Sequence, residues 1–296
     1  MLRMSSTKWP RIIVLGNLKG GSGKSTLSMH VAIALMKAGR RVATLDLDFH
    51  QRTLTRYLEN RRNWASKRNL TLDVPTHFCL DQGFAETPLK SEDEQIKFVV
   101  GAVDAAQAFY DIIVIDTPSG ANRVNLFAHG LADTVLTPIN DSFLDLDVIA
   151  TLKDSADQLV PSPYAETIHR AIDARRSVTN RNTDWVVVRN RLSPLESRNE
   201  RAVRNAVEAA AAAAGFRTAT GLTERLIYRE FFPMGLTAFD SMETSLLGVK
   251  PSLSHVMARQ EVRQLLTIVD PTASERRDPW GSVPGAQERR AVKRAV

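Results

Sequence analysis

Lys-Gly-Gly-Ser-Gly-Lys-Ser-Thr, residues 19–26, is the stretch that decides the fold of this chain. The apolar run Ile12–Leu15 precedes it, and apolar residues at helical spacing follow it, which predicts a helix over Ser25–Lys37. A strand, a glycine-rich turn and a helix in this order direct backbone N–H groups toward a phosphate. The sequence therefore predicts that this loop binds the phosphates of a nucleotide.

The residue types of the loop suit the separate parts of phosphate binding. Glycines allow the tight turn, a lysine adds a charge that reaches the outer phosphates, and a serine hydroxyl is a ligand for Mg²⁺. In this chain Lys24 is the lysine and Ser25 the serine. The predicted nucleotide-binding residues of the loop are Gly20, Gly21, Ser22, Gly23, Lys24, Ser25 and Thr26.

One position departs from the usual phosphate-loop pattern. The pattern asks for glycine five residues before Gly23, where this chain has Leu18, and the next residue is a second lysine, Lys19. The stretch therefore resembles the deviant phosphate loop of the ParA and MinD class of ATPases. That resemblance implies that Lys19 is catalytic and reaches across a dimer to the nucleotide of the partner subunit.

Two later strands end in carboxylates. A strand predicted over Arg41–Asp48 ends in Asp46 and Asp48, and a strand over Ile112–Ile115 is followed by Asp116. Open α/β folds build their sites at the carboxyl ends of parallel strands. We expect Asp48 to organise the water that attacks ATP and Asp116 to hold Mg²⁺ together with the loop serine. The alternative for the first pair of acids is a solvated loop.

The end of a further strand offers a contact for the base. A strand is predicted over Trp185–Val188, and Asn190 follows it. Its amide provides both the donor and the acceptor that the edge of adenine requires. We therefore expect Asn190 to bind the nucleotide, with an ordinary turn asparagine as the alternative.

Strands and helices alternate along most of the chain. This predicts one doubly wound α/β domain over residues 9–270, a P-loop NTPase of the ParA and MinD type, with a mostly parallel sheet and helices on both faces. A helix is also predicted over 143–153, and 70–91 is predicted to be irregular. Residues 1–8 are predicted to be a disordered lead and 271–296 a flexible basic tail.

Composition narrows the class of protein. No apolar stretch approaches the roughly 20 residues that span a bilayer, and no signal-peptide pattern precedes Trp9, so we expect a cytoplasmic protein without membrane insertion. Cys79 is the single cysteine, which excludes an intrachain disulfide and a cysteine-based metal cage. The net charge of +6 favours a polyanionic partner.

Arginines recur late in the chain on a predicted helix over 195–214 and shortly after it. Three of them are spaced three residues apart and share one helix face, which suits nonspecific contact with the DNA backbone. Because Glu200 lies among them, a solvated helix face is the alternative. The candidate DNA-binding residues are Arg198, Arg201, Arg204, Arg225 and Arg229.

Stretches spread over residues 11–270 resemble, more narrowly, the MipZ family of division-site ATPases. They include Gly16-Asn17, Asp46-Leu47-Asp48, Glu59-Asn60-Arg61-Arg62, Asp116-Thr117-Pro118, Asn140-Asp141-Ser142-Phe143, Ile227-Tyr228-Arg229-Glu230 and Ala258-Arg259-Gln260-Glu261. The resemblance implies a slow ATPase, activated by ATP-dependent dimerisation, that binds DNA nonspecifically on the nucleoid. It also implies contact with the partition protein ParB and inhibition of FtsZ assembly.

Departures and alternatives remain beside this resemblance. The family is denser in basic residues after the position of Arg198, where this chain has Glu200 and Ala202, so the resemblance does not fix the strength of DNA binding. A ParA-type chromosome or plasmid partition ATPase would use the same site. A small-molecule phosphotransferase or ligase on the same loop is the alternative from another class.

Overall fold

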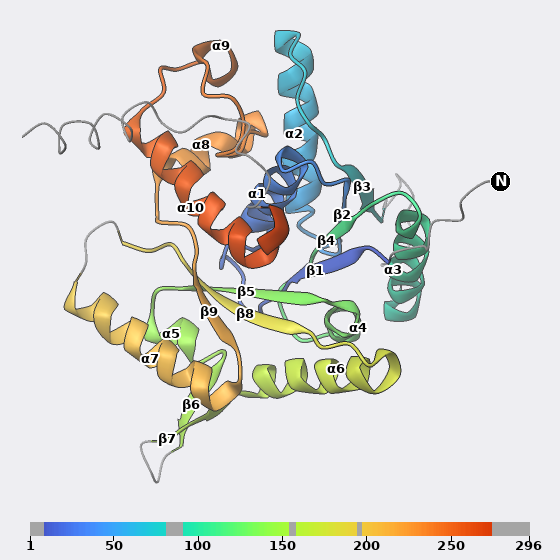
Figure 1. Ribbon diagram of the computed structural model, residues 1–296, viewed down its shortest axis with the longest axis vertical. Helices are drawn as coiled ribbons and strands as arrows, with labels where there is room; N and C mark the ends of the chain where they lie inside the picture. Colours follow the sequence, from blue (N-terminus) through green and yellow to red (C-terminus); the bar gives the residue numbers. More distant parts are fainter. Residues whose placement is uncertain (1–8, 81–90, 154–157, 194–196, 274–296) are drawn as a thin grey trace, which may run out of the picture.

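A parallel sheet forms the centre of the computed structural model, which describes residues 9–80, 91–153, 158–193 and 197–273 (Figure 1). Within those ranges the sheet has seven strands in the order β3-β2-β4-β1-β5-β8-β9, and all neighbouring strands are parallel. The strands are β1 (Arg11–Leu15), β2 (Val42–Asp46), β3 (Thr76–Cys79), β4 (Ile112–Asp116), β5 (Thr134–Asn140), β8 (Asp184–Asn190) and β9 (Arg217–Thr220). The predicted doubly wound α/β fold is confirmed.

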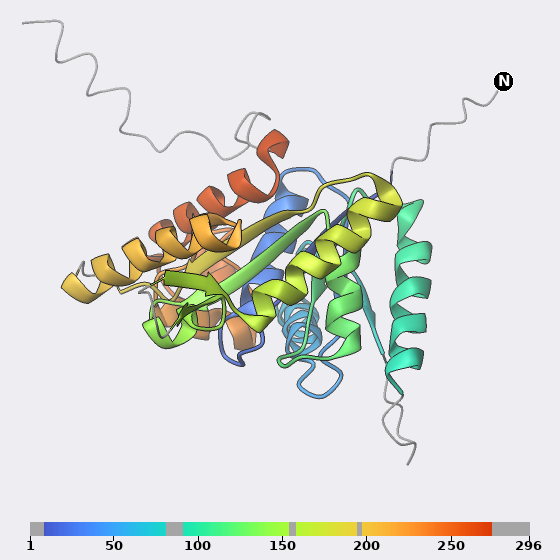
Figure 2. The ribbon, with the colours of Figure 1, turned by 90° about the horizontal axis from the view of Figure 1, so that it is seen from below.

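Helices cover both faces of this sheet (Figures 1 and 2). On one face lie α1 (Lys24–Lys37), α2 (Thr53–Arg68), α8 (Leu226–Met234), α9 (Thr244–Leu247) and α10 (Leu253–Val269). On the other lie α3 (Glu92–Gln107), α4 (Arg123–Leu131), α6 (Pro163–Thr179) and α7 (Arg198–Ala214). No helix in the described ranges has both the length and the apolar character needed to cross a membrane.

Because helices cover both faces of the sheet, its central strands are apolar over most of their length. Ile13 and Leu15 of β1 pack into one core, whereas Ile12 and Val14 pack into the other. Successive strand residues point to opposite faces, so a strand buried on both sides must be apolar throughout. The same reason accounts for the continuous apolar run of β4, all of which is buried.

Two predicted segments were wrong. The stretch 70–91, predicted to be irregular, contains β3, which pairs with β2 at the edge of the sheet. The predicted helix over 143–153 stops after α5 (Phe143–Leu146), and β6 (Ala150–Lys153) then pairs antiparallel with β7 (Gln158–Pro161). In both cases a four-residue strand gains its stability from pairing, for β3 with the distant β2 and for β6 with the next strand, β7. The periodicity of the segment alone does not report such pairing.

Most of the two terminal segments lies outside the described residues. These are residues 1–8, predicted to be a disordered lead, and residues 274–296 of the predicted basic tail. The first three residues of that tail form a 3-10 turn over Pro271–Ala273. Within it, Thr272 donates to Asp270 and accepts a hydrogen bond from Arg40, which lies in the turn between α1 and β2. The chain thus stays attached to the domain at least to this turn.

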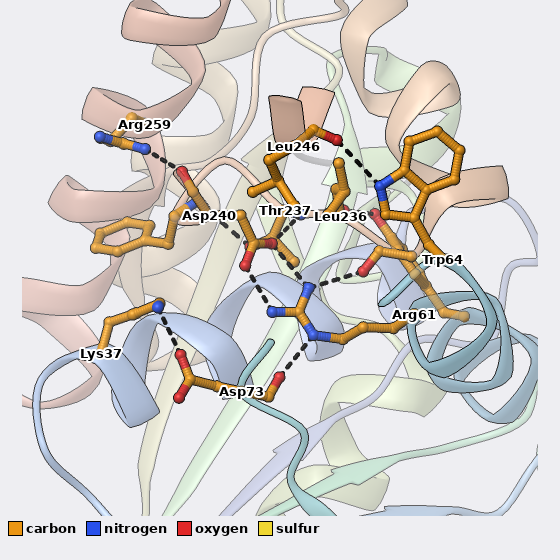
Figure 3. Close-up of polar contacts among 12 residues, drawn as sticks. Lys37, Arg61, Trp64, Asp73, Leu236, Thr237, Asp240, Leu246 and Arg259 are labelled. Carbon is orange, nitrogen blue, oxygen red and sulfur yellow. Dashed lines mark hydrogen bonds and ion pairs between the residues drawn. The ribbon is translucent and has the colours of Figure 1, made fainter. Parts of the chain in front are cut away.

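A buried ion pair joins α2 to the loop after α8 (Figure 3). The guanidinium of Arg61 donates to both carboxylate oxygens of Asp240 at 2.6 and 2.8 Å, and the side chains are 0% and 1% exposed. Arg61 also donates to the carbonyl oxygens of Asp73 and Gly235. Gly235 has a φ of +64°, and a Cβ there would lie 2.0 Å from the backbone nitrogen of Arg61. Only glycine fits beside this pair.

Candidate functional site

The glycine-rich loop links β1 to α1 at the carboxyl edge of the sheet (Figure 1). Gly21 and Gly23 have φ values of +75° and +97°, a backbone region that residues other than glycine rarely adopt. Gly23 is also the residue that caps the N-terminus of α1. The loop therefore leads directly into a helix N-terminus, whose N–H groups and dipole favour an anion.

Lys24 lies folded under the loop. Its Nζ donates to the carbonyl oxygens of Lys19 at 3.0 Å and Asn17 at 3.2 Å, and to the Ser119 hydroxyl at 3.3 Å. Burial lowers the pKa of Lys24, while the charges of Asp116 and Asp48 raise it. The ammonium is thus held at the loop by neutral oxygens, within reach of the charges of the predicted catalytic residue Asp48 and the predicted metal ligand Asp116.

Ser119 is a site residue that the sequence reasoning missed. It belongs to the turn after β4 and meets Lys24 from a position 95 residues further along the chain. Its hydroxyl also lies 3.5 Å from where a Cβ on Gly20 would stand. The sequence feature that could have predicted this role is its position three residues after Asp116. The fold places the turn after β4 beside the phosphate loop.

Asp116 is completely buried at the end of β4. Ser28 donates to its Oδ1 at 3.2 Å, whereas its buried Oδ2 meets no donor with regular hydrogen-bond geometry in the described part of the chain. Burial raises the pKa of Asp116, the Asp46 charge raises it further, and Ser25, Lys24 and Ser28 lower it. An unpaired carboxylate oxygen close to a serine hydroxyl is a donor set that Mg²⁺ accepts, so these residues fit the predicted metal site.

The two acids at the end of β2 differ in their surroundings. Asp46 is buried and accepts hydrogen bonds from the Thr55 backbone nitrogen and hydroxyl at 2.9 and 2.7 Å. It therefore fastens β2 to the first turn of α2. Asp48 is half-buried and accepts a hydrogen bond from the Gln51 nitrogen at 2.8 Å. Of the two, Asp48 is the one open to solvent at the loop.

Lys19 lies against α5 in the single chain. Its Nζ is 2.9 Å from Oδ1 of Asp145 and donates to the carbonyl oxygen of Leu144. Its backbone nitrogen donates to the Asn17 side chain at 2.8 Å, which fixes the start of the loop. The Lys19 side chain is 40% exposed, so it is accessible to a partner subunit. Its role across a dimer stays a prediction.

Asn190, at the end of β8, holds the phosphate loop through hydrogen bonds of its side chain. Its Nδ2 donates to the carbonyl oxygen of Ser22 at 2.9 Å, and its Oδ1 accepts from the Leu222 nitrogen at 3.1 Å. A Cβ on Gly23 would lie 2.3 Å from that Nδ2, which is a second reason for glycine there. The amide is thus engaged within the chain, and its predicted contact with adenine stays untested.

The five candidate DNA-binding arginines lie on two helices. Arg198, Arg201 and Arg204 lie in the first two turns of α7. Arg225 caps α8 and pairs with Glu261 at 2.8 Å, and Arg229 is exposed and pairs with Glu224 at 3.1 Å. The charges of Arg225 and Arg229 are therefore paired within the chain, and DNA binding by the five arginines stays a prediction.

Comparisons with known proteins agree with this geometry. A family model described as ATPase MipZ matches residues 11–271. The chromosome partitioning protein ParA of Myxococcus xanthus is 28% identical over 167 residues, 50% of this chain and 58% of that protein. A chloroplastic MinD homologue of Arabidopsis thaliana is 24% identical over 204 residues, 63% of this chain and 60% of that protein. The chain thus spans less than two thirds of these two relatives.

Solved structures give the same fold. McdA of Cyanothece in complex with ATP superposes with a TM-score of 0.55 at 14% identity, covering 88% of this chain and 95% of that one. A chain of the MinC:MinD cell division protein complex of Aquifex aeolicus superposes with a TM-score of 0.52 at 19% identity, covering 93% of this chain and 97% of that one. At such identities the likeness establishes the fold alone. Because the family match extends over 11–271, however, this chain belongs to the MipZ family of ATPases, within the ParA and MinD class.

Proposed function

We propose that this protein is an ATP-dependent dimerising switch that hydrolyses ATP, binds DNA nonspecifically and regulates division-site placement by inhibiting FtsZ assembly. One observation carries the ATP-hydrolysing part of the proposal. Lys24, Asp48 and Asp116 come from three separate segments that end at the same edge of the sheet: Asp116 closes β4 opposite Asp46 of β2, Asp48 follows β2, and Lys24 begins α1 after β1. The charges of both carboxylates raise the pKa of the lysine. These are the parts that nucleotide hydrolysis needs: a phosphate ligand, a residue that positions water and a metal ligand.

Each residue has a distinct part in the proposed reaction. The loop N–H groups and Lys24 bind the phosphates of ATP, and Asp48 orients the attacking water. Ser25 and Asp116 would hold Mg²⁺, which when bound supplies charge that offsets the phosphate oxygens. Ser119 and Asn190 keep the loop in shape from the turn after β4 and the end of β8.

The dimer follows from Lys19. A positive charge delivered in trans to the transferring phosphate is worth about 10³ to 10⁵ in rate. Within one chain Lys19 is paired with Asp145 and the Leu144 carbonyl on α5. If the partner subunit receives this lysine instead, hydrolysis depends on assembly, and ATP holds the two subunits together until it is cleaved.

Loss of the second lysine tests the switch. We expect Lys19→Ala to bind ATP as a monomer, whereas the wild type becomes a dimer with ATP and stays a monomer with ADP or no nucleotide. Lys67→Ala, which removes an exposed lysine of α2, is the matched control and should dimerise normally. Size-exclusion chromatography with light scattering, beside ATP-binding titrations, measures both properties. A wild type that is monomeric with ATP would end the proposal, and a dimeric Lys19→Ala would remove the role of Lys19.

DNA binding should be electrostatic. The arginines of α7 provide no base-reading pattern, so binding should be independent of sequence and should weaken with salt, by about 0.9 log units per neutralised phosphate for each log unit of salt. Arg198→Ala is expected to lower that slope by about one phosphate. Arg176→Ala, an exposed arginine of α6, is the control. Fluorescence anisotropy with unrelated duplexes at several salt concentrations measures the slope, and equal affinity at low and high salt would contradict it.

A ParA-type partition ATPase is the second candidate, favoured by the likeness to the Myxococcus xanthus partitioning protein. Its task would be to move DNA. Inhibition of FtsZ assembly and contact with ParB, in turn, rest on membership of the MipZ family. Pelleting of FtsZ with and without the protein and ATP separates the two, because only the division-site function reduces the pellet. Turnover stimulated by a metabolite, with none by DNA, would favour a phosphotransferase instead.

A further inference from the structure

Two apolar features adjoin Lys19. The short helix α5 exposes Phe143 and Leu144, which are 50% and 79% accessible. A mostly apolar cavity of about 390 Å³ opens between the phosphate loop, the first turns of α4 and the start of α6. Its walls include Leu18, Ala121, Leu126, Pro163 and Tyr164. Figure 2 shows these segments along the same edge of the molecule as the loop between β1 and α1.

Lys19 links the two features physically. Its Nζ donates to the carbonyl oxygen of Leu144, and its neighbour Leu18 lines the cavity. A subunit that covers Lys19 must therefore also cover the exposed pair on α5 and the mouth of the cavity. In a two-fold dimer the same patch faces itself, so a protrusion and a hollow within one patch become complementary contacts on both sides.

We propose that, in the ATP-bound dimer, Phe143 and Leu144 of each subunit insert into the cavity beside the phosphate loop of the other. The occupant of the cavity is thus a second copy of this chain. This inference rests on the proposed dimerising function and names the contact that stabilises the dimer. Buried apolar anchors in pockets are the contacts that dominate the affinity of interfaces.

Charge supports this choice of occupant. The cavity has two exposed arginines among its lining residues, of which Arg123 pairs with Asp93 at 3.0 Å, which leaves Arg170 as the cation for a partner subunit. Arg170 donates to a carbonyl and a hydroxyl oxygen within α6, both neutral acceptors. The segment to be inserted carries the exposed Asp147 directly after α5. Opposite charges at the rim of an interface steer association and fix its register.

Crosslinking tests the contact directly. In a Cys79→Ser, Asp48→Ala background, Leu144→Cys combined with Leu126→Cys should give a covalent dimer with a short bismaleimide in ATP, and little in ADP or without nucleotide. Leu144→Cys combined with Val178→Cys is the control, because Val178 is 84% exposed but lies at the far end of α6. Each variant with a single introduced cysteine shows whether two subunits crosslink through the same position in both.

A surface variant gives an independent measurement. We expect Leu144→Ser to weaken ATP-dependent dimerisation at least about tenfold while ATP binding by the monomer is unchanged. Val178→Ser removes a comparably exposed apolar side chain elsewhere and should have no effect. If the wild type dimerises with ATP but the crosslink fails and Leu144→Ser dimerises normally, this inference alone is overturned. If the wild type does not dimerise, the proposed function fails together with it.

Discussion

Asp48→Ala is expected to lower ATP turnover by about 10²- to 10⁴-fold, the usual contribution of a positioned carboxylate to proton transfer or water activation. The variant should still bind ATP. The Asp48 carboxylate accepts a hydrogen bond from the Gln51 nitrogen, whereas the proposed phosphate ligands are Lys24 and the loop amides. Because hydrolysis would end the dimer, its loss should also lengthen the lifetime of the ATP dimer.

Two measurements separate this effect from a folding defect. Phosphate release gives turnover, and light scattering after ATP removal gives the dimer lifetime. Asp104→Ala, an exposed aspartate of α3 away from the site, is the control and should match the wild type in both. An Asp48→Ala protein that turns over ATP at the wild-type rate would move the water-positioning role to another residue.

Arg61→Met is expected to destabilise the fold by about 3–5 kcal/mol, the cost of leaving one member of a buried ion pair without its partner. Figure 3 shows why the penalty is large: the Asp240 carboxylate is 1% exposed and takes two hydrogen bonds from the guanidinium. Asp240→Asn should destabilise the fold to a similar extent, because it leaves the buried guanidinium of Arg61 without its charge partner. Denaturant unfolding, monitored by circular dichroism, measures the free energy.

The matched control is an exposed pair of the same chemistry. Arg229 and Glu224 are 3.1 Å apart with side chains 73% and 55% exposed, and such pairs contribute roughly 0–1 kcal/mol. Arg229→Ala should therefore change stability by less than about 1 kcal/mol. If Arg61→Met and Arg229→Ala were equally mild, the pair would not be the anchor between α2 and the loop after α8.

Acid should weaken the same anchor. Burial alone would raise the pKa of Asp240, but the charge of Arg61 and hydrogen bonds from Arg61 and Thr237 outweigh it, so the pKa lies below its usual range. A carboxyl group whose folded-state pKa is lowered stabilises the fold above its unfolded pKa, and this stabilisation is lost as the pH falls toward the folded value. Unfolding free energy measured from pH 7 downward should fall less steeply for Asp240→Asn than for the wild type.

Local sequence was enough for much of the site. The phosphate loop is contiguous, so the types and spacing of residues 19–26 predict its role without knowledge of the fold. The continuous apolar runs of β1 and β4 predict strands buried on both faces, and hence the parallel sheet that places Asp116 near Lys24. What these features share is that the information lies within one element and its immediate neighbours.

Contacts across the fold were decided by the tertiary structure alone. Ser119 meets Lys24 across 95 residues, Lys19 reaches α5 across 125, and Asn190 supports the loop across 168. The four-residue strand β3 likewise exists because β2, about thirty residues earlier in the chain, pairs with it. Hydrogen bonds of this kind depend on where the packed sheet brings chain segments together, a property that no local periodicity or motif encodes. The sequence by itself thus determined the phosphate loop and the sheet, and the tertiary structure decided what surrounds Lys19, Lys24 and Asn190.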